Sequence, residues 1–141
     1  MTIEYRMLSA GEESLLVQVA PDVFDHAIDR RFASEFLADP RHHLGVAIDA
    51  GIVVGFASAV HYVHPDKAPE LWINEVSVTE SHRRRGLAQA LLRLLFARAR
   101  SLRCQAAWVL TDRTNDAATN LYTSVGGDAS RDHVMFTFPL E

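Results

Sequence analysis

The sequence of 141 residues predicts an α/β (α+β) fold, in which a mixed sheet carries helices on both faces. Strand-like segments joined by a hairpin fill much of the first half, and strands alternate with helical patterns in the second half. The length fits one average domain, so we expect a single domain over residues 1–141. The ordinary composition, 48% hydrophobic and 23% charged, excludes a disordered acidic chain, a collagen-like repeat and a disulfide-rich mini-protein.

The first half of the chain predicts one strand, two helices and a hairpin, at residues 3–8, 12–19, 25–37, and 44–49 with 52–62. The second helix has apolar residues at helical spacing, namely Ile28, Phe32 and Phe36. Pro40 ends that helix, because proline cannot continue the hydrogen-bond ladder. Gly51 supplies the positive φ that the tight turn of the hairpin requires.

The second half predicts two strand–helix units and a last strand, at residues 71–78, 86–102, 106–110, 115–125 and 134–138. The first of these strands is apolar on both faces, so we expect a central, buried strand. The long helix has a core stripe of Leu87, Leu91, Leu94, Leu95 and Leu102. Gly126 and Gly127 end the second helix, and alternating large and small residues indicate the final strand.

Charge is divided unevenly along the chain. Seven of the 14 basic residues are arginines between positions 83 and 103, a stretch without acids, so this stretch carries +7 and the remainder −11. The division suggests two partners of opposite charge. The acids Asp22, Asp25, Asp29 and Glu35 lie on or near the second predicted helix and suit a cationic ligand, although surface acids also serve solubility alone.

A phosphate site is predicted where residues 76–88 run from a buried strand through a short turn into the long helix. The first N–H groups of a helix lack partners and lie at its positive end, which favours phosphate. Gly86 lets the backbone approach a ligand closely, and Arg83, Arg84 and Arg85 add charge that suits phosphate oxygens. The alternative is a solvated turn before an ordinary helix. Neither a P-loop nor a dinucleotide-binding glycine pattern is present.

The sequence resembles the GNAT superfamily of acetyl-CoA-dependent N-acetyltransferases through two motifs in the expected order. The phosphate motif Arg/Gln-x-x-Gly-x-Gly/Ala is met by Arg83, Gly86 and Ala88. The motif Asn-x-x-Ala-x-x-Leu-Tyr-x-x-x-Gly is met by Asn115, Ala118, Leu121, Tyr122 and Gly126. The resemblance implies a mostly antiparallel sheet of six to seven strands with about four helices, and a homodimer.

The resemblance also implies roles for individual residues. Backbone groups of Val76 and Val78 would pair with the pantetheine arm of acetyl-CoA like an added strand, and Asn115 would contact the same arm. Tyr122 would protonate the departing thiolate. The pyrophosphate would bind to the N–H groups of Arg84, Arg85, Gly86, Leu87 and Ala88.

Within the superfamily the chain looks most like the small aminoglycoside 3-N-acetyltransferases. That likeness rests on residues 53–57, 75–78, 82–88 and 133–136, although those relatives carry Asp where this chain has Glu75. It implies direct transfer of the acetyl group to a primary amine of a small cationic acceptor such as an aminoglycoside. A protein or peptide amine is the alternative acceptor.

Two side chains are candidates for proton transfer. Glu75 lies on a strand predicted to be buried, where burial would raise its pKa toward that of a general base. It could instead pair with an arginine or bind a cationic substrate without taking a proton. Tyr122, taken alone, is a core aromatic on a helical stripe, and only its place in the motif favours the acid role.

Other features narrow the class of protein. The single Cys104 cannot form an intrachain disulfide, and we see no signal peptide or membrane-spanning run, so we expect a soluble, cytoplasmic protein without a membrane partner. His61 and His64 lack zinc-site spacing, and we expect no metal. A nucleic-acid-binding module is a rival, but the −11 remainder would repel a phosphate backbone, so we expect no nucleic acid. A non-catalytic acetyl-CoA-binding domain is a second rival.

Overall fold

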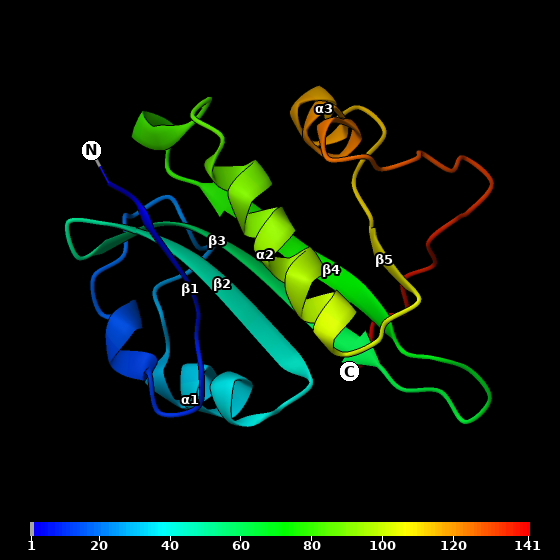
Figure 1. The fold of residues 1–141 in the computed structure, drawn as a ribbon, viewed down its shortest axis with the longest axis horizontal. Coiled ribbons are helices and arrows are strands. Elements are labelled where there is room, and N and C mark those ends of the chain that lie inside the picture. Colours follow the sequence, from blue (N-terminus) through cyan, green and yellow to red (C-terminus); the bar gives the residue numbers. More distant parts are fainter. Residues whose placement is uncertain (1) are drawn as a thin grey trace.

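The computed structural model describes residues 2–141 and contains one five-stranded sheet in the order β1-β2-β3-β4-β5 (Figure 1). The strands are β1 (Glu4–Met7), β2 (His42–Asp49), β3 (Ile52–Tyr62), β4 (Glu70–Val78) and β5 (Ala106–Val109). The helices are α1 (Arg30–Ala38), α2 (Leu87–Ser101) and α3 (Asp116–Ser124), with the short 3-10 turns η1 (Glu13–Leu16) and η2 (Glu80–His82). The predicted hairpin, long helix, following strand and last helix are confirmed within one or two residues.

The sheet is mixed and mostly antiparallel, as expected. Neighbouring strands from β1 to β4 run antiparallel, and β5 joins β4 in parallel. The expected number of elements was too high, because residues 2–141 form five strands and three α-helices rather than six to seven strands and about four helices. Residues 12–19 form only the turn η1, and residues 134–138 pair with no strand.

Helix α1 begins five residues later than the sequence analysis predicted. The Asp29 side chain accepts hydrogen bonds from the backbone N–H groups of Arg31 (2.9 Å) and Phe32 (3.2 Å), which fixes the N-terminus of the helix. The predicted apolar stripe is also wrong, because Phe32 is 62% exposed under the Arg31 guanidinium and Ile28 lies before the helix. Leu37 is the buried residue of α1 instead.

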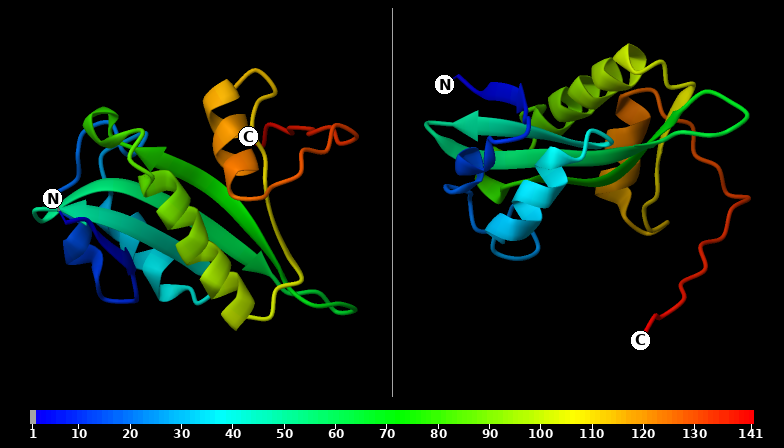
Figure 2. Two further views of the ribbon diagram at one scale, coloured as in Figure 1. Left: turned by 45° about the horizontal axis from the view of Figure 1, so that its top comes forward. Right: turned by 90° about the horizontal axis from the view of Figure 1, so that it is seen from below.

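The core consists of two clusters on opposite faces of the sheet. One lies under α2 and includes Leu87, Leu91 and Leu95 with inward residues of the strands, whereas Leu102, at the end of the predicted stripe, is only partly buried. The other lies under η1 and α1 and includes Leu16, Leu37, Val46 and Phe56. The two helices cover opposite faces of the sheet (Figure 2), and period-two alternation along β2 and β3 sends successive side chains to the two clusters.

A buried histidine joins α2 to the sheet. His43 on β2 is 2% exposed, and its Nδ1 lies 3.2 Å from the Arg98 guanidinium while its Nε2 lies 2.8 Å from Nδ1 of His61. Because the guanidinium only donates, Nδ1 of His43 accepts and its Nε2–H donates to His61. Burial is the main cause that lowers the pKa of His43 to about 4, and the neighbouring His61 and Arg98 contribute to the same shift. The Arg98 guanidinium is therefore bound to a buried side chain of the sheet.

Candidate active site

The site begins at an irregularity in β4. Ser58 pairs with Glu75 and Ala59 pairs with Ile73, so Asn74 is an extra residue in a β-bulge. The parallel pairing of β4 with β5 ends at the same place, at Ile73 and Val109. Beyond it the two strands diverge toward the start of α2 (Figure 1). Residues 74–78 therefore have a strand neighbour on the β3 side alone. Asn74 and Glu75 are exposed, which corrects the expectation that this whole strand is buried.

The backbone of Val76 and Val78 faces the opening between β4 and β5. The N–H of Thr79 donates to the carbonyl of Val54 at 2.8 Å, so these two residues form a hydrogen-bonded pair. Hydrogen-bonded and non-hydrogen-bonded pairs alternate along antiparallel strands. Val78 opposite Gly55 is consequently a non-hydrogen-bonded pair, and so is Val76 two residues earlier. Their N–H and C=O groups point away from β3.

The turn between β4 and α2 presents further backbone donors. Gly86 is the N-cap of α2 with φ 80°, and no side chain caps the helix, so its first N–H groups lack protein partners by geometry. Arg84 also has a positive φ, 61°, which costs about 1–2 kcal/mol in a residue with a side chain. Left-handed residues in such turns bend successive N–H groups toward a common anion-binding concavity.

Hydrogen bonds of several side chains hold the turn between β4 and α2 in place. His82 Nε2 lies 2.7 Å from the Asp49 carboxylate on the β2–β3 hairpin, and Ser81 Oγ lies 2.8 Å from His82 Nδ1. The Asp22 carboxylate accepts hydrogen bonds from the Thr79 hydroxyl and the Glu80 N–H, which lower its pKa. The sequence analysis assigned no role to His82 or Asp49, because contacts across 33 residues leave no local signal.

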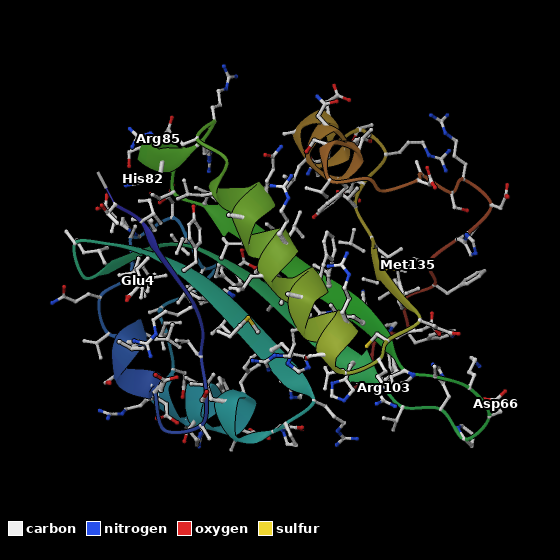
Figure 3. All side chains as sticks on the ribbon, viewed as in Figure 1. Glu4, Asp66, His82, Arg85, Arg103 and Met135 are labelled. Carbon is white, nitrogen blue, oxygen red and sulfur yellow. The ribbon has the colours of Figure 1, made fainter. Side chains whose placement is uncertain are left out.

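The arginines of the turn have different surroundings. Arg83 donates its Nε–H to the Val78 carbonyl at 2.9 Å and lies 3.9 Å from Asp22, so it braces the turn against the end of β4. Arg84 and Arg85 are exposed at the start of α2. In Figure 3, Arg85 and His82 mark one corner of the molecule while Arg103 lies near the far end of α2. Arg83, Arg84 and Arg85 thus lie at the turn before α2, where the sequence predicts a phosphate site.

Glu75 lies on the α1 side of β4. It is opposite Ser58, and Val76 packs into the α2 cluster, so alternation directs Glu75 to the other face. Its residue is exposed rather than buried, which corrects the expectation from sequence. Partial burial of the carboxyl raises the pKa of Glu75, and the Asp25 carboxyl raises it further through charge and a hydrogen bond.

A cavity of about 570 Å³ lies on the same face, between η1, the loop before α1 and α1 itself. Asp25 lines this cavity and contacts Glu75, so it connects the cavity to β4. Asp25 stands in the loop before α1, not on a helix as predicted. The remaining lining is mainly apolar and includes Leu16, Val17, Phe24, Ile28 and Ala33.

Tyr122 lies on α3 and packs against the α2-side cluster, together with Val76 and Leu121. It is half-buried, and burial raises the pKa of its hydroxyl, which therefore stays protonated at neutral pH. Glu75 and Tyr122 thus lie on opposite faces of the sheet, with the divergence of β4 and β5 between them. A carboxylate on one side can accept a proton, and a phenol on the other side can donate one.

Asn115 caps α3. Its side-chain oxygen accepts a hydrogen bond from the N–H of Ala118 at 3.0 Å, and the residue is exposed. The structure therefore gives this motif residue a structural contact that the resemblance did not imply. Its amide N–H groups are the part of the side chain that a ligand could still use.

The chain belongs to the Acetyltransferase (GNAT) family, whose model matches residues 11–126. It is accordingly an acetyl-CoA-dependent N-acetyltransferase. A search of curated proteins finds no match.

Solved structures of similar fold cover the whole length. An aminoglycoside acetyltransferase from an uncultured soil metagenomic sample has a TM-score of 0.83 at 22% identity, covering 100% of both chains. AAC(6')-Iy in complex with the bisubstrate analog CoA-S-monomethyl-acetylneamine has a TM-score of 0.81 at 17% identity, covering 99% of this chain and 100% of the other. A ribosomal-protein-alanine N-acetyltransferase from Brucella melitensis biovar Abortus 2308 has a TM-score of 0.74 at 20% identity, covering 97% and 100%. At these identities the likeness establishes the fold.

Residues 2–141 contain neither a membrane-spanning helix nor a metal-binding cluster. No helix in that range has the length and apolar character needed to span a membrane. The same range holds no group of three or more His, Cys, Asp and Glu side chains arranged for a metal ion. His61 and His64 have separate partners, His43 and Glu70.

The cap at Asn115 gives a prediction about stability. Asn115→Ala removes the acceptor of the Ala118 N–H and should lower the free energy of unfolding by about 1 kcal/mol, measured by urea denaturation. Asn115→Asp keeps a capping oxygen and should unfold like the wild type. Asn120→Ala, an exposed asparagine on the same helix, is the matched control. An Asn115→Ala variant as stable as that control would remove the capping role.

Proposed function

We propose that this chain transfers the acetyl group of acetyl-CoA directly to a primary amine of a small cationic acceptor, with an aminoglycoside as the leading candidate. The observation that carries the proposal is the divergence of β4 and β5, flanked by the uncapped N-terminus of α2 and by the Asp25–Glu75 carboxyl pair. Family membership supplies the reaction class, and the Asp25 carboxyl on the cavity wall supports the positive charge of the acceptor.

The residues present fit acetyl-CoA. The outward N–H and C=O of Val76 and the N–H of Val78 match an arm that carries amides, because strands pair through such groups. The N–H groups at the start of α2, with Gly86 at the cap, match a pyrophosphate. We assign the pyrophosphate to residues 84–88 and an arm contact to the Asn115 amide. Acetyl-CoA supplies the activated acetyl group.

Glu75 and Tyr122 divide the proton transfers in this proposal. The Glu75 carboxylate, directly or through a water, accepts the proton that the amine loses when its nitrogen bonds to the acetyl carbon. The Tyr122 hydroxyl donates a proton to the sulfur as the carbon–sulfur bond breaks. After product release Glu75 gives its proton to water and the tyrosine regains a proton from water, so each cycle begins from the same protonation state. The raised pKa of Glu75 makes its carboxylate a stronger base, and the raised pKa of Tyr122 keeps its hydroxyl protonated before the transfer.

The acceptor is the part of the proposal that rests most on charge. Asp25 lines the cavity and lies close enough to Glu75 to raise its pKa, so an amine that enters the cavity meets Asp25 with the carboxyl of Glu75 beyond it. The likeness to aminoglycoside acetyltransferases supports the same class of acceptor. A protein N-terminal amine is the second candidate, supported by the likeness to the ribosomal-protein-alanine enzyme.

A panel of amines tests the function. Purified protein is mixed with acetyl-CoA and with aminoglycosides, polyamines or peptides that begin with alanine, and thiol release gives kcat/KM for each. We expect the highest value for an aminoglycoside, with a KM that rises as salt screens the acidic lining. Mass spectrometry of the product then locates the acetylated amine. A preference for peptides would move the assignment to protein acetylation, and no turnover with any amine would contradict the proposal.

The carboxyl pair gives a prediction about pH. A base works when deprotonated, so kcat/KM should rise with pH through the pKa of Glu75, which lies above its ordinary value. Asp25→Asn removes the neighbouring carboxyl, so the pKa of Glu75 falls and the acidic limb of the profile moves to lower pH. Glu75→Gln should abolish that limb and lower kcat by about 10²–10⁴-fold. Glu4→Gln, at an exposed glutamate on β1 away from the cavity, is the control.

Tyr122 gives a prediction about turnover. Tyr122→Phe keeps the ring that packs against the α2-side cluster and removes only the hydroxyl. Turnover should fall at least about tenfold while the affinity for acetyl-CoA, measured by calorimetry, changes little. Tyr5→Phe on β1 controls for the loss of a phenol elsewhere. Unchanged turnover in Tyr122→Phe would leave this side chain a packing role only.

A further inference from the structure

Aromatic side chains of three neighbouring strands meet just before β4 and β5 diverge. They are Tyr62 on β3, Trp72 on β4 and Trp108 on β5, and the two tryptophans lie opposite each other in the parallel pairing. The two indole centroids are 5.0 Å apart, and the Tyr62 ring lies 6.1 Å and 6.5 Å from those of Trp72 and Trp108. All three rings are parallel to within 12°, and aromatic pairs favour stacking at such separations. We call these three side chains the aromatic cluster.

The aromatic cluster lies on the same face of the sheet as Glu75. Leu71 and Ile73 pack into the core under α2, so strand alternation directs Trp72 to the opposite face, toward the α1 side. Trp108 shares that face because it pairs with Trp72, and the tyrosine of the cluster stacks with both indoles. Glu75 points to the same side three positions farther along β4, which is roughly 10 Å at about 3.3 Å per residue. The aromatic cluster therefore adjoins the candidate base.

The aromatic cluster is open to solvent. Tyr62 is 39% exposed and Trp108 is 37% exposed, while Trp72 is half-buried. Leu110, two positions beyond Trp108, is 50% exposed. Helix α1, which covers this side of the sheet, packs mainly against β2 and η1. Stacking across strands stabilises a sheet whether or not the rings face solvent, whereas an exposed apolar patch on one face is typical of a binding surface.

Carboxylates flank the aromatic cluster on both sides along β4. Glu70 lies opposite Tyr62 in the β3–β4 register, and its carboxylate lies 3.1 Å from His64 Nε2. Glu75 and Asp25 form the carboxyl pair on the other side. A purely apolar partner would bury these carboxylates without a compensating charge, which is unfavourable. A cation avoids that penalty, and the negative face of an aromatic ring, that of tryptophan most of all, attracts cations as well.

We propose that the aromatic cluster binds a second ring of the acceptor, one that carries ammonium groups, while the amine to be acetylated lies at Glu75. The inference rests on the proposed function for the position of the reacting amine, and it adds the class of acceptor, which has at least two linked saturated rings. A single six-membered ring is shorter than the roughly 10 Å that separates Trp72 from Glu75 along the strand. A linear polyamine carries the charge but has no ring face to lie against the indoles.

Fluorescence gives a direct measure of binding, because Trp72 and Trp108 are the two tryptophans of the chain. Purified protein without acetyl-CoA is titrated with three multi-ring polyamines, kanamycin, gentamicin and sisomicin. The comparison compounds are 2-deoxystreptamine, which has one ring, and spermine, which has none. We expect a saturable change of the tryptophan emission with at least one multi-ring compound. Its Kd should be at least about tenfold below those of both comparison compounds, because stacking adds to charge only there.

Kinetics of matched variants assign the effect to the aromatic cluster. Trp108→Leu keeps an apolar side chain and removes the indole, so the KM for the multi-ring acceptor should rise at least about tenfold while kcat and the KM for acetyl-CoA change little. Trp108→Phe restores a ring and should recover part of the affinity. Tyr5→Leu removes an aromatic side chain of the same 37% exposure from the α2 side of the sheet and should have no effect. Thermal unfolding establishes that each variant is folded, and Tyr62→Leu replaces Trp108→Leu if the latter is not.

Several results would overturn the inference. A titration without a saturable change, or with equal affinity for spermine, would show that the aromatic cluster recognises no ring. An unchanged KM in both Trp108→Leu and Tyr62→Leu would leave the rings a stacking role within the sheet. An emission that changes with protein concentration but with none of the compounds would mean that a second copy of the chain covers the cluster. The proposed function fails differently, by absence of turnover with every amine, and the fluorescence titration does not depend on turnover.

Discussion

The end of β4–β5 pairing at Ile73 is the constraint on which the rest of the structure depends. The bulge at Asn74 shifts the register against β3 at the same level, so the outward backbone groups of Val76 and Val78 lose a strand neighbour. Buried backbone N–H and C=O groups are normally hydrogen-bonded, and in a sheet their partners lie on the neighbouring strands. Here the unsatisfied segment leads directly into the uncapped helix α2. The row of outward backbone groups therefore starts at the level of the bulge and continues to the start of α2.

Side chains on both faces of the sheet lie near this row of backbone groups. The α2 face is apolar and carries Tyr122, whereas the α1 face brings Asp25 beside Glu75 through a loop. Asp22, three residues before Asp25, fastens that loop to the turn before α2. The loop that supplies the acidic lining is therefore anchored to the turn that supplies the anion site. The hydrogen bonds of Asp22 to Thr79 and Glu80 therefore connect the loop that carries Asp25 to the turn that carries the predicted phosphate site.

Local patterns explain what the sequence predicted well. The hairpin around Gly51, the leucine stripe of α2 and the glycine at its start depend on neighbours a few residues away. The contacts it missed join distant segments: Asp25 lies 50 positions from Glu75, and Asp49 lies 33 from His82. The late start of α1 was missed because the capping preference of Asp29 competed with an apolar period. The strand at 134–138 was predicted from the alternation of large and small residues, but this segment pairs with no strand among residues 2–141.

The arginine-rich stretch also shows that formal charge and available charge differ. Arg83 is committed to the Val78 carbonyl, and Arg98 is committed to His43 inside the α2–sheet contact. Both use the fork of the guanidinium, which bonds at one nitrogen while others remain directed elsewhere. A lysine would keep the charge at either position but could not reproduce the planar geometry. At positions 83 and 98, an exchange that conserves charge is therefore not one that conserves structure.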